Sequence, residues 1–204
     1  MSAYVSTKNR MSVQTIAKIS ILGALAFLVM MFEIPLPFAP DFYKLGFDEV
    51  IVLIGGFALG PWAAVCIEAL KIALNLLIGG TITMGVGELT NFLIGLSFVL
   101  PATIIYQRDK TRKHALLGLI TGTICMTILG GLLNYFIMLP AYSYFMNLPL
   151  ERIIEIGHAV NPNINGLLAL VLMATTPFNV LKGVLCSIVV FLSYKKVSPV
   201  IKKQ

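Results

Sequence analysis

The chain has 204 residues, of which 58% are hydrophobic and 12% are charged, whereas soluble domains carry about a quarter charged residues. This composition excludes an ordinary soluble domain and indicates a single all-α integral membrane domain over residues 1–204. The formal net charge of +6 could indicate nucleic-acid binding. In a membrane protein, however, basic residues report orientation, so we expect no nucleic-acid partner.

Six apolar segments are candidates to cross the lipid bilayer as helices. Crossing takes roughly 20 residues, and the second and third segments are shorter. They are separated by Gly60-Pro61, a dipeptide that ends one helix and starts the next. One kinked helix over 47–78 would be about 48 Å long, too long for a core of about 30 Å, so two short spans are predicted. The six predicted spans are residues 14–33, 47–60, 62–78, 86–106, 115–139 and 165–194.

Basic residues cluster in the segments that a six-span bundle places on one side of the membrane. Cytoplasmic segments carry an excess of Lys and Arg, so both the N and C termini are predicted to be cytoplasmic. The opposite loops hold only Lys44 and Arg152, together with acidic residues. The clustered residues are Lys8, Arg10, Lys18, Arg108, Lys110, Arg112, Lys113, Lys195, Lys196, Lys202 and Lys203.

Two predicted outer loops are longer than simple turns. Residues 34–46 contain three prolines, which exclude a regular helix, and their aromatic side chains favour a lid or re-entrant stretch over the bundle. In the other loop, residues 140–165, a short interfacial helix is predicted over 148–158. For both loops, a plain connection anchored at the membrane surface by aromatic residues is the alternative.

Polar side chains inside the predicted spans are costly in lipid, so each is a functional hypothesis. In the third span, Glu68, Lys71 and Asn75 share one helical face, where Glu68 and Lys71 could form an ion pair that only holds the bundle together. In the fourth span, Glu88 and Asn91 share a face near the outer end. Helix capping and packing is the alternative for that second pair.

The fifth and sixth spans carry the polar groups best suited to a ligand. Asn134 lies roughly 8 Å from the outer end of the fifth span, and its buried amide needs a partner from protein, water or ligand. In the sixth span, Pro177 frees a backbone carbonyl, and Asn179 and Lys182 project the same way one turn apart. This set of donors and acceptors suits the carbonyl and imide edge of a flavin.

These groups also have structural alternatives. Asn134 could serve an interhelical hydrogen bond, and Lys182 could pair with Glu68 or Glu88. Counted from the start of the sixth span, Asn179 lies far deeper than Asn134. The two can share a site only if the sixth helix begins well outside the hydrocarbon.

The sequence contains no pattern typical of an enzyme or a metal site. His114 and His158 lie in different loops, so they predict no metal cluster. No G-x-x-x-x-G-K-[ST] phosphate loop is present, so active uptake would need a partner or an ion gradient. No acidic pair recurs in two halves of the chain, as an ion-coupled inverted repeat would show.

The first span has a face of small residues that could receive another helix. Ala17, Ser20 and Ala24 lie along it, and Ser20 and Ala24 form a small-xxx-small pair that permits close approach. The alternative is packing within the bundle.

Three stretches carry a resemblance that covers almost the whole chain. They are FYKLGFDE over 42–49, GELTNF over 87–92 and PFNVLKG over 177–183. With its six spans, short basic inner loop and proline-rich first outer loop, the chain resembles the substrate-binding S-components of energy-coupling factor (ECF) vitamin transporters. The third stretch resembles the riboflavin-specific branch in particular.

The resemblance implies a subunit that binds riboflavin tightly from outside a bacterial cell. It implies docking through the first helix onto a transmembrane coupling subunit, driven by two ATPases, in the cytoplasmic membrane. The family docking motif Ala-x-x-x-Ala corresponds to Ser20-x-x-x-Ala24 here. Asn134, Asn179 and Lys182 would hold the isoalloxazine ring, and the first outer loop would close the pocket. The predicted substrate-binding residues are Phe42, Tyr43, Leu45, Phe47, Glu88, Asn91, Asn134, Asn179 and Lys182.

A flavin ring is planar and largely apolar, so aromatic walls with a few polar groups suit it. Riboflavin is the predicted substrate and no cofactor is expected. FMN is admitted only if its phosphate stays at the pocket mouth, because a buried phosphate would need more cations than Lys182 and Lys44. The alternatives are an S-component for another vitamin or precursor, a self-contained secondary carrier, an intramembrane enzyme and a structural subunit without a ligand.

Overall fold

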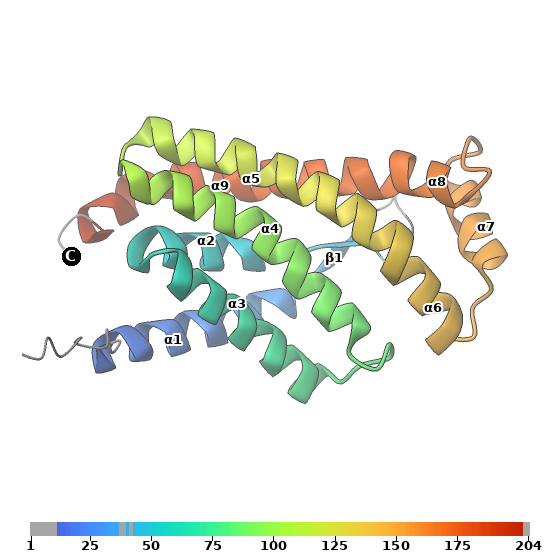
Figure 1. Ribbon diagram of the computed structural model, residues 1–204, viewed down its shortest axis with the longest axis horizontal. Coiled ribbons are helices and arrows are strands. Elements are labelled where there is room, and N and C mark those ends of the chain that lie inside the picture. The colour runs from blue at the N-terminus through green and yellow to red at the C-terminus, as the bar shows by residue number, and fades with distance from the viewer. Residues whose placement is uncertain (1–11, 37–39, 41–42, 202–204) are drawn as a thin grey trace, which may run out of the picture.

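The computed structural model describes residues 12–36, 40 and 43–201 (Figure 1). Within these residues, five helical segments are long and apolar enough to cross a membrane: Val13–Met30, Pro61–Gly79, Val86–Arg108, Arg112–Phe145 and Leu167–Ser193. The helices are α1 (Val13–Met30), α2 (Asp48–Leu59), α3 (Pro61–Leu74), α4 (Val86–Arg108), α5 (Arg112–Leu133), α6 (Leu139–Phe145), α7 (Leu150–Val160), α8 (Leu167–Leu170) and α9 (Thr176–Ile201). Three π-helical segments, η1 (Asn75–Gly79), η2 (Asn134–Met138) and η3 (Val171–Thr175), and two strands, β1 (Ile34–Pro35) and β2 (Lys44–Leu45), complete the set.

The predicted second span, residues 47–60, is the short helix α2. Its 12 residues extend about 18 Å, less than the hydrocarbon thickness of about 30 Å. The helix ends at Leu59 because Gly60 takes a φ of +99°, and Pro61 then starts α3. The predicted break at Gly60-Pro61 is therefore confirmed, but α2 is too short to count as a full span by its length.

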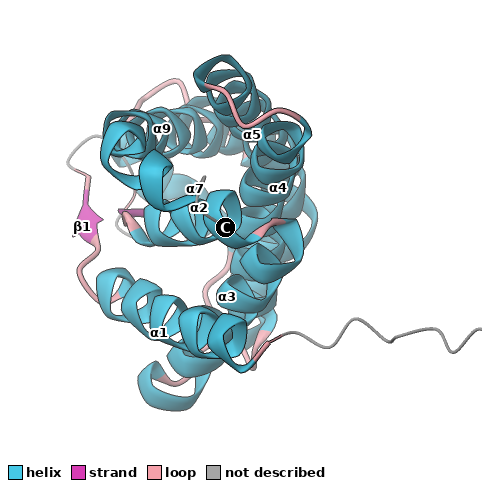
Figure 2. Ribbon diagram, turned by 90° about the vertical axis from the view of Figure 1, so that its left-hand side faces the viewer, coloured by secondary structure: helices cyan, strands magenta, loops and turns pink. Residues whose placement is uncertain are grey.

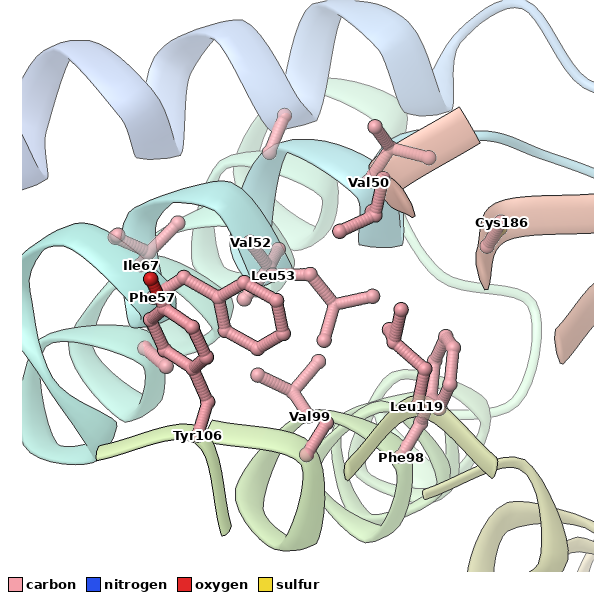
Figure 3. Close-up of a cluster of buried hydrophobic side chains, with 14 of the residues drawn as sticks. Val50, Val52, Leu53, Phe57, Ile67, Phe98, Val99, Tyr106, Leu119 and Cys186 are labelled. Carbon is pink, nitrogen blue, oxygen red and sulfur yellow. The ribbon is translucent and has the colours of Figure 1, made fainter. Parts of the chain in front are cut away.

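Viewed end-on, α2 lies in the middle of the bundle (Figure 2). It contacts α1, α3, α4 and α9. Phe57 of α2 stacks on Tyr106 of α4 with ring centroids 4.3 Å apart, and Leu53 and Val99 lie beside this pair in the buried cluster (Figure 3). Because it is surrounded on all sides, α2 can carry polar residues at its N-terminus into the interior.

Two prolines are accommodated by π-helical segments. The fifth predicted span was expected to end at residue 139, but the helix continues through η2 and Pro140 to Phe145. Pro140 is the second residue of α6 and directly follows η2, where the helical hydrogen-bond pattern changes, so its missing N–H costs less than inside a regular α-helix. Pro177 follows η3 in the same way. Such π-helical insertions frequently occur at functional sites.

The two outer segments are ordered over their described residues. Strands β1 and β2 pair antiparallel, with Ile34 opposite Leu45, so the paired residues of the first segment are extended rather than helical, as its prolines predict. The predicted helix over 148–158 is confirmed as α7, whose fully buried Ile153 packs with Ile164 in an apolar cluster.

The ends of the bundle differ in what they carry. The start of α1, the end of α9 and the connection from α4 to α5 lie together at one end, on the left of Figure 1. We call this the terminal end. At the other end, which we call the α7 end, α6, α7 and α8 close the bundle (Figure 1).

Candidate ligand-binding site

A cavity of about 210 Å³ lies among α1, β2, α2, α3, α4, α5, η2, α6 and α9. Along α4 its wall runs from Gly87 to Gly95, a rise of about 12 Å. The volume is below the approximately 300–1,000 Å³ of small-molecule sites, so a vitamin must widen the cavity or extend through its mouth. Of the predicted substrate-binding residues, Tyr43, Glu88, Asn91, Asn134, Asn179 and Lys182 line it.

The asparagines Asn134 and Asn179 meet at Gly130 of α5. The Asn134 side-chain amide donates a 2.8 Å hydrogen bond to the Gly130 carbonyl. A β-carbon on Gly130 would lie 2.5 Å from Nδ2 of Asn179, so the absence of a side chain there lets α9 bring its amide against α5. Asn179 is buried, and its Nδ2 has no hydrogen-bond partner among the described residues. A buried donor in this state is available to a ligand oxygen.

The two asparagines reach a similar depth because the fifth helix continues past its predicted end at residue 139. The sixth helix begins at Leu167, well before Asn179, and the fifth continues to Phe145, well past Asn134. Each side chain therefore lies several turns inside its helix at the α7 end. Both side chains line the same cavity.

Lys182 reaches the cavity from α9, one turn beyond Asn179. Its side chain is 18% exposed, and its Nζ lies 3.7 Å from Oδ1 of Asp48. Of the described carboxylates, Asp48 is thus its ion-pair partner, rather than the expected alternatives Glu68 and Glu88. Asp48 holds the ammonium at the cavity wall without surrounding it.

Lys71 is the centre of a buried ionic cluster beneath the cavity. Its Nζ lies 2.7 Å from Asp48 Oδ2, 3.0 Å from Glu49 Oε1 and 2.8 Å from Glu68 Oε1. The predicted Glu68–Lys71 pair is therefore confirmed, as one arm of a larger cluster. All four side chains are at least 96% buried. Breaking a buried pair by removing one partner costs about 3–5 kcal/mol, so we expect the cluster to tie α2 firmly to α3.

Local geometry makes room for this cluster. Asp48 and Glu49 occupy the first turn of α2, where the helix dipole favours negative charge. On α4, a β-carbon at Gly95 would lie 2.3 Å from Glu68 Oε1 and 2.9 Å from Glu49 Oε1. Only a glycine at this position lets α4 close over the carboxylates.

The N-terminus of α4 forms the outer part of the cavity wall. Thr81 Oγ1 donates a 2.9 Å hydrogen bond to Glu88 Oε2 and accepts one of the same length from the Gly85 amide. Glu88 thus supports the start of α4 indirectly, by accepting a hydrogen bond from Thr81, which binds the Gly85 amide. The carboxylate and the Asn91 side chain nevertheless line the cavity, so a structural role does not remove them from the site.

Tyr43 and Phe178 provide an aromatic wall. Their ring centroids lie 5.1 Å apart, both are buried, and both line the cavity. The Tyr43 hydroxyl is hydrogen-bonded to the Thr175 hydroxyl of η3. Burial raises the pKa of the Tyr43 phenol well above its usual value, so the hydroxyl stays neutral at physiological pH.

Three predicted residues of the first outer segment are not at the cavity wall. Leu45 is buried on β2, and Phe47 precedes α2 and packs against the central cluster; neither lines the cavity. Phe42 lies outside the described residues.

Three cavity acids were absent from the predicted site. Glu33 follows α1, and Asp48 and Glu49 start α2; all three line the cavity. Two adjacent acids at the head of an apolar segment are a signal that the sequence did contain, since charges in spans are functional hypotheses. Glu33 stands at the edge of a predicted span, where an exposed position was equally consistent with the pattern.

The small-residue face of α1 points away from the bundle. Ala17, Ser20 and Ala24 are exposed, whereas Gly23 is buried against Leu70 of α3. Packing within the bundle therefore uses Gly23 and not the Ser20–Ala24 pair.

The side chains that line the cavity are suited to binding a small molecule. Within the described residues, no group of three His, Cys, Asp or Glu side chains is arranged to hold a metal ion. Two amides, an ammonium and an aromatic pair offer hydrogen bonds and a flat apolar surface to a small molecule.

Comparison with known proteins identifies the kind of protein that carries this cavity. Residues 14–194 match the family described as ECF transporter, substrate-specific component. The chain is 33% identical to the riboflavin transporter FmnP of Bacillus subtilis (95% of this chain, 97% of that protein). It is 35% identical to the riboflavin transporter RibU of Staphylococcus aureus (91% and 90%).

A solved structure of the S component of a bacterial ECF transporter superposes with a TM-score of 0.71. It is 32% identical, and the match covers 93% of this chain and 98% of that one. The relatives are transporter components and not enzymes. The chain belongs to the family of substrate-specific components of ECF transporters.

Proposed function

We propose that this chain captures riboflavin outside a bacterial cell and delivers it to an ECF module in the cytoplasmic membrane. The observation that carries the proposal is the convergence of Asn134, Asn179 and Lys182 on one cavity with an aromatic wall. The names of the two relatives as riboflavin transporters support the choice of vitamin.

The polar groups match one edge of the flavin ring. The unpartnered Nδ2 of Asn179 and the Lys182 ammonium are donors for ring carbonyls, and the Asn134 carbonyl oxygen is an acceptor for the imide N–H. Tyr43 and Phe178 would lie against the face of the ring. Phosphate is not required by any of these contacts, which favours riboflavin over FMN.

Asp48 keeps Lys182 ready for this role. A lone ammonium inside a membrane protein is costly, and the carboxylate 3.7 Å away offsets that cost. Asp48 is in turn held by Lys71, so the ligand-facing cation is anchored through two further residues to α3.

Riboflavin would enter through the first outer segment. At about 210 Å³, the cavity is smaller than typical small-molecule sites, so β1 and β2 would move outward on entry. The paired part of this segment is only two residues long in each strand, and so short a ladder opens at little cost.

We further propose six membrane crossings, of which the segment containing α2 is the second, and both termini in the cytoplasm. The start of α1 and the end of α9 lie together at the terminal end (Figure 1). The basic residues Arg108, Lys110, Arg112 and Lys113 flank the connection from α4 to α5 at that end, which agrees with the positive-inside rule.

Energy would come from a coupling subunit and two ATPases that dock on α1. Ala17, Ser20 and Ala24 form an exposed strip on α1, and small residues let a partner helix approach closely in lipid. Docking would then occur on the side of the bundle formed by α1.

Titration of riboflavin fluorescence with purified protein in detergent tests the proposal. Asn179→Ala and Lys182→Ala should each weaken binding by about tenfold to a hundredfold, since each removes a hydrogen bond to a ligand in a buried site. Leu168→Ala on the exposed face of α8 is the matched control and should bind as the unaltered protein does. Unaltered affinity in both site variants would refute the site, and tight binding of a different vitamin would refute the substrate.

A further inference from the structure

A second concave surface lies between α5 and α9 near the terminal end, away from the ligand cavity. Its volume is about 350 Å³. Figures 1 and 2 both show α5 and α9 side by side over this stretch. Two apolar ridges with a spacing of four residues bound the groove. They are Leu116, Ile120 and Ile124 on α5, and Val184, Ile188 and Leu192 on α9.

All six ridge side chains are exposed, whereas the floor of the groove is not. Leu119 is fully buried there, and the hydroxyls of Thr123 and Ser187 lie 3.4 Å apart. The small Thr and Ser side chains create the depression between the ridges. The groove is therefore a property of the sequence and not a gap between loosely packed helices.

The length and the lining of the groove suit an extended hydrocarbon chain. From Leu116 to Ile124 the groove is about 12 Å long. Apart from Thr123 and Ser187 its lining side chains are apolar, so a chain that needs no hydrogen bonds can lie along it.

A cation extends one ridge beyond the groove. Arg112 precedes Leu116 by one helical turn, at the same spacing of four residues, and Lys113 is its neighbour. Both side chains are exposed at the N-terminus of α5. The nearby carboxylate of Asp109 lies 3.1 Å from the His114 ring. An acyl chain in the groove would thus place its head group beside two cations.

We propose that this groove binds one acyl chain of an anionic phospholipid, whose phosphate-bearing head group is held by Arg112 and Lys113. The apolar groove and the two cations beyond it match the acyl chain and the charged head group of such a lipid. The site would be occupied whether or not the ligand cavity is filled, so the inference goes beyond the proposed function. A lipid seated there would hold α5, which leads directly into Asn134, against α9, which carries Asn179.

Native mass spectrometry of the full-length protein in detergent tests this site. The probes are phosphatidylglycerol and phosphatidylcholine with identical acyl chains. Each Lys or Arg near an anionic head group contributes about 1 kcal/mol, a factor of about five. We expect phosphatidylglycerol to bind at least about fivefold more tightly, and Arg112→Gln to reduce this preference by about fivefold.

Two further variants separate the groove from general surface charge. Lys18→Gln removes one exposed cation from α1, away from the groove, and should leave the preference intact. Ser187→Leu fills the floor and should weaken binding of both lipids. Equal binding of the two lipids, an equal effect of Lys18→Gln and Arg112→Gln, or unaltered binding by Ser187→Leu would each overturn the proposal.

Discussion

The pair Gly130 and Gly131 on α5 gives a sharp test of the site, because the two residues differ only in what their α-carbons face. A β-carbon at Gly130 would lie 2.5 Å from Asn179 Nδ2, whereas one at Gly131 would lie 3.6 Å from Val171 Cγ1 at its closest. Gly130→Ala and Gly131→Ala are therefore matched in chemistry and in helix position.

The geometry sets the size of the expected effect. Non-bonded heavy atoms rest at about 3.5–4.0 Å, so Gly130→Ala requires the Asn179 amide to move by about 1 Å. We expect a rotation of that side chain to achieve this without moving the backbone, because the contact is with side-chain atoms of Asn179 alone. Both variants gain about 0.5–1 kcal/mol of helix stability from the added methyl group. A hydrogen bond in a buried site is worth roughly 0.5–1.5 kcal/mol, and an unmade one costs 1–3 kcal/mol.

Gly130→Ala should therefore weaken riboflavin binding by about tenfold to a hundredfold while the protein remains at least as stable. Gly131→Ala should retain the original Kd. Fluorescence titration measures the Kd, and thermal unfolding in detergent measures stability. Equal Kd values for the two variants would refute the placement of Asn179 in the site, and a fall in melting temperature for Gly130→Ala would refute the argument from side-chain rotation.

Three further predictions concern the cluster, the cavity mouth and α1. Lys71→Met leaves three buried carboxylates without their shared cation and should lower stability by about 3–5 kcal/mol; an unchanged unfolding temperature would contradict the cluster. Glu88→Gln should strengthen FMN relative to riboflavin by about threefold to tenfold in a competition titration, because a phosphate adds about −1.5 to −2 charges; an unchanged ratio would exclude Glu88 from the mouth. Replacing Ser20 and Ala24 by Leu should abolish uptake through an ECF module while the Kd for riboflavin stays unchanged. Loss of both uptake and riboflavin binding would contradict a role of these residues in docking alone.

Much of the fold followed from hydropathy and from a few residues with strong local preferences. The break at Gly60-Pro61 and the short helix α7 could be predicted because Gly, Pro and interfacial aromatics act locally. Whether α2 faces lipid or protein could not be predicted, since an apolar segment of this length has the same sequence pattern in either environment. Only the packing of four helices around it shows that α2 is enclosed.

The site was predictable in part for the same reason. Polar side chains are unfavourable inside a membrane span, so the positions of Asn134, Asn179 and Lys182 within predicted spans identified them as functional candidates. The partner of Lys182 depended on which helices are neighbours, and the central position of α2 makes that partner Asp48 rather than Glu68 or Glu88.

The role of Gly130 was also beyond a sequence-based prediction. A glycine inside an apolar helix is compatible with many packing arrangements. Its importance arises from the side chain of Asn179 on a helix more than forty residues away in the chain.

The central claim, that the cavity holds riboflavin, is tested most directly by the absorption spectrum of the protein purified in detergent. Retained riboflavin would make the preparation yellow, with bands near those of the free flavin, and denaturation followed by chromatography would separate riboflavin from FMN. The account predicts a yellow protein that releases riboflavin. A colourless protein to which added riboflavin does not bind would contradict it.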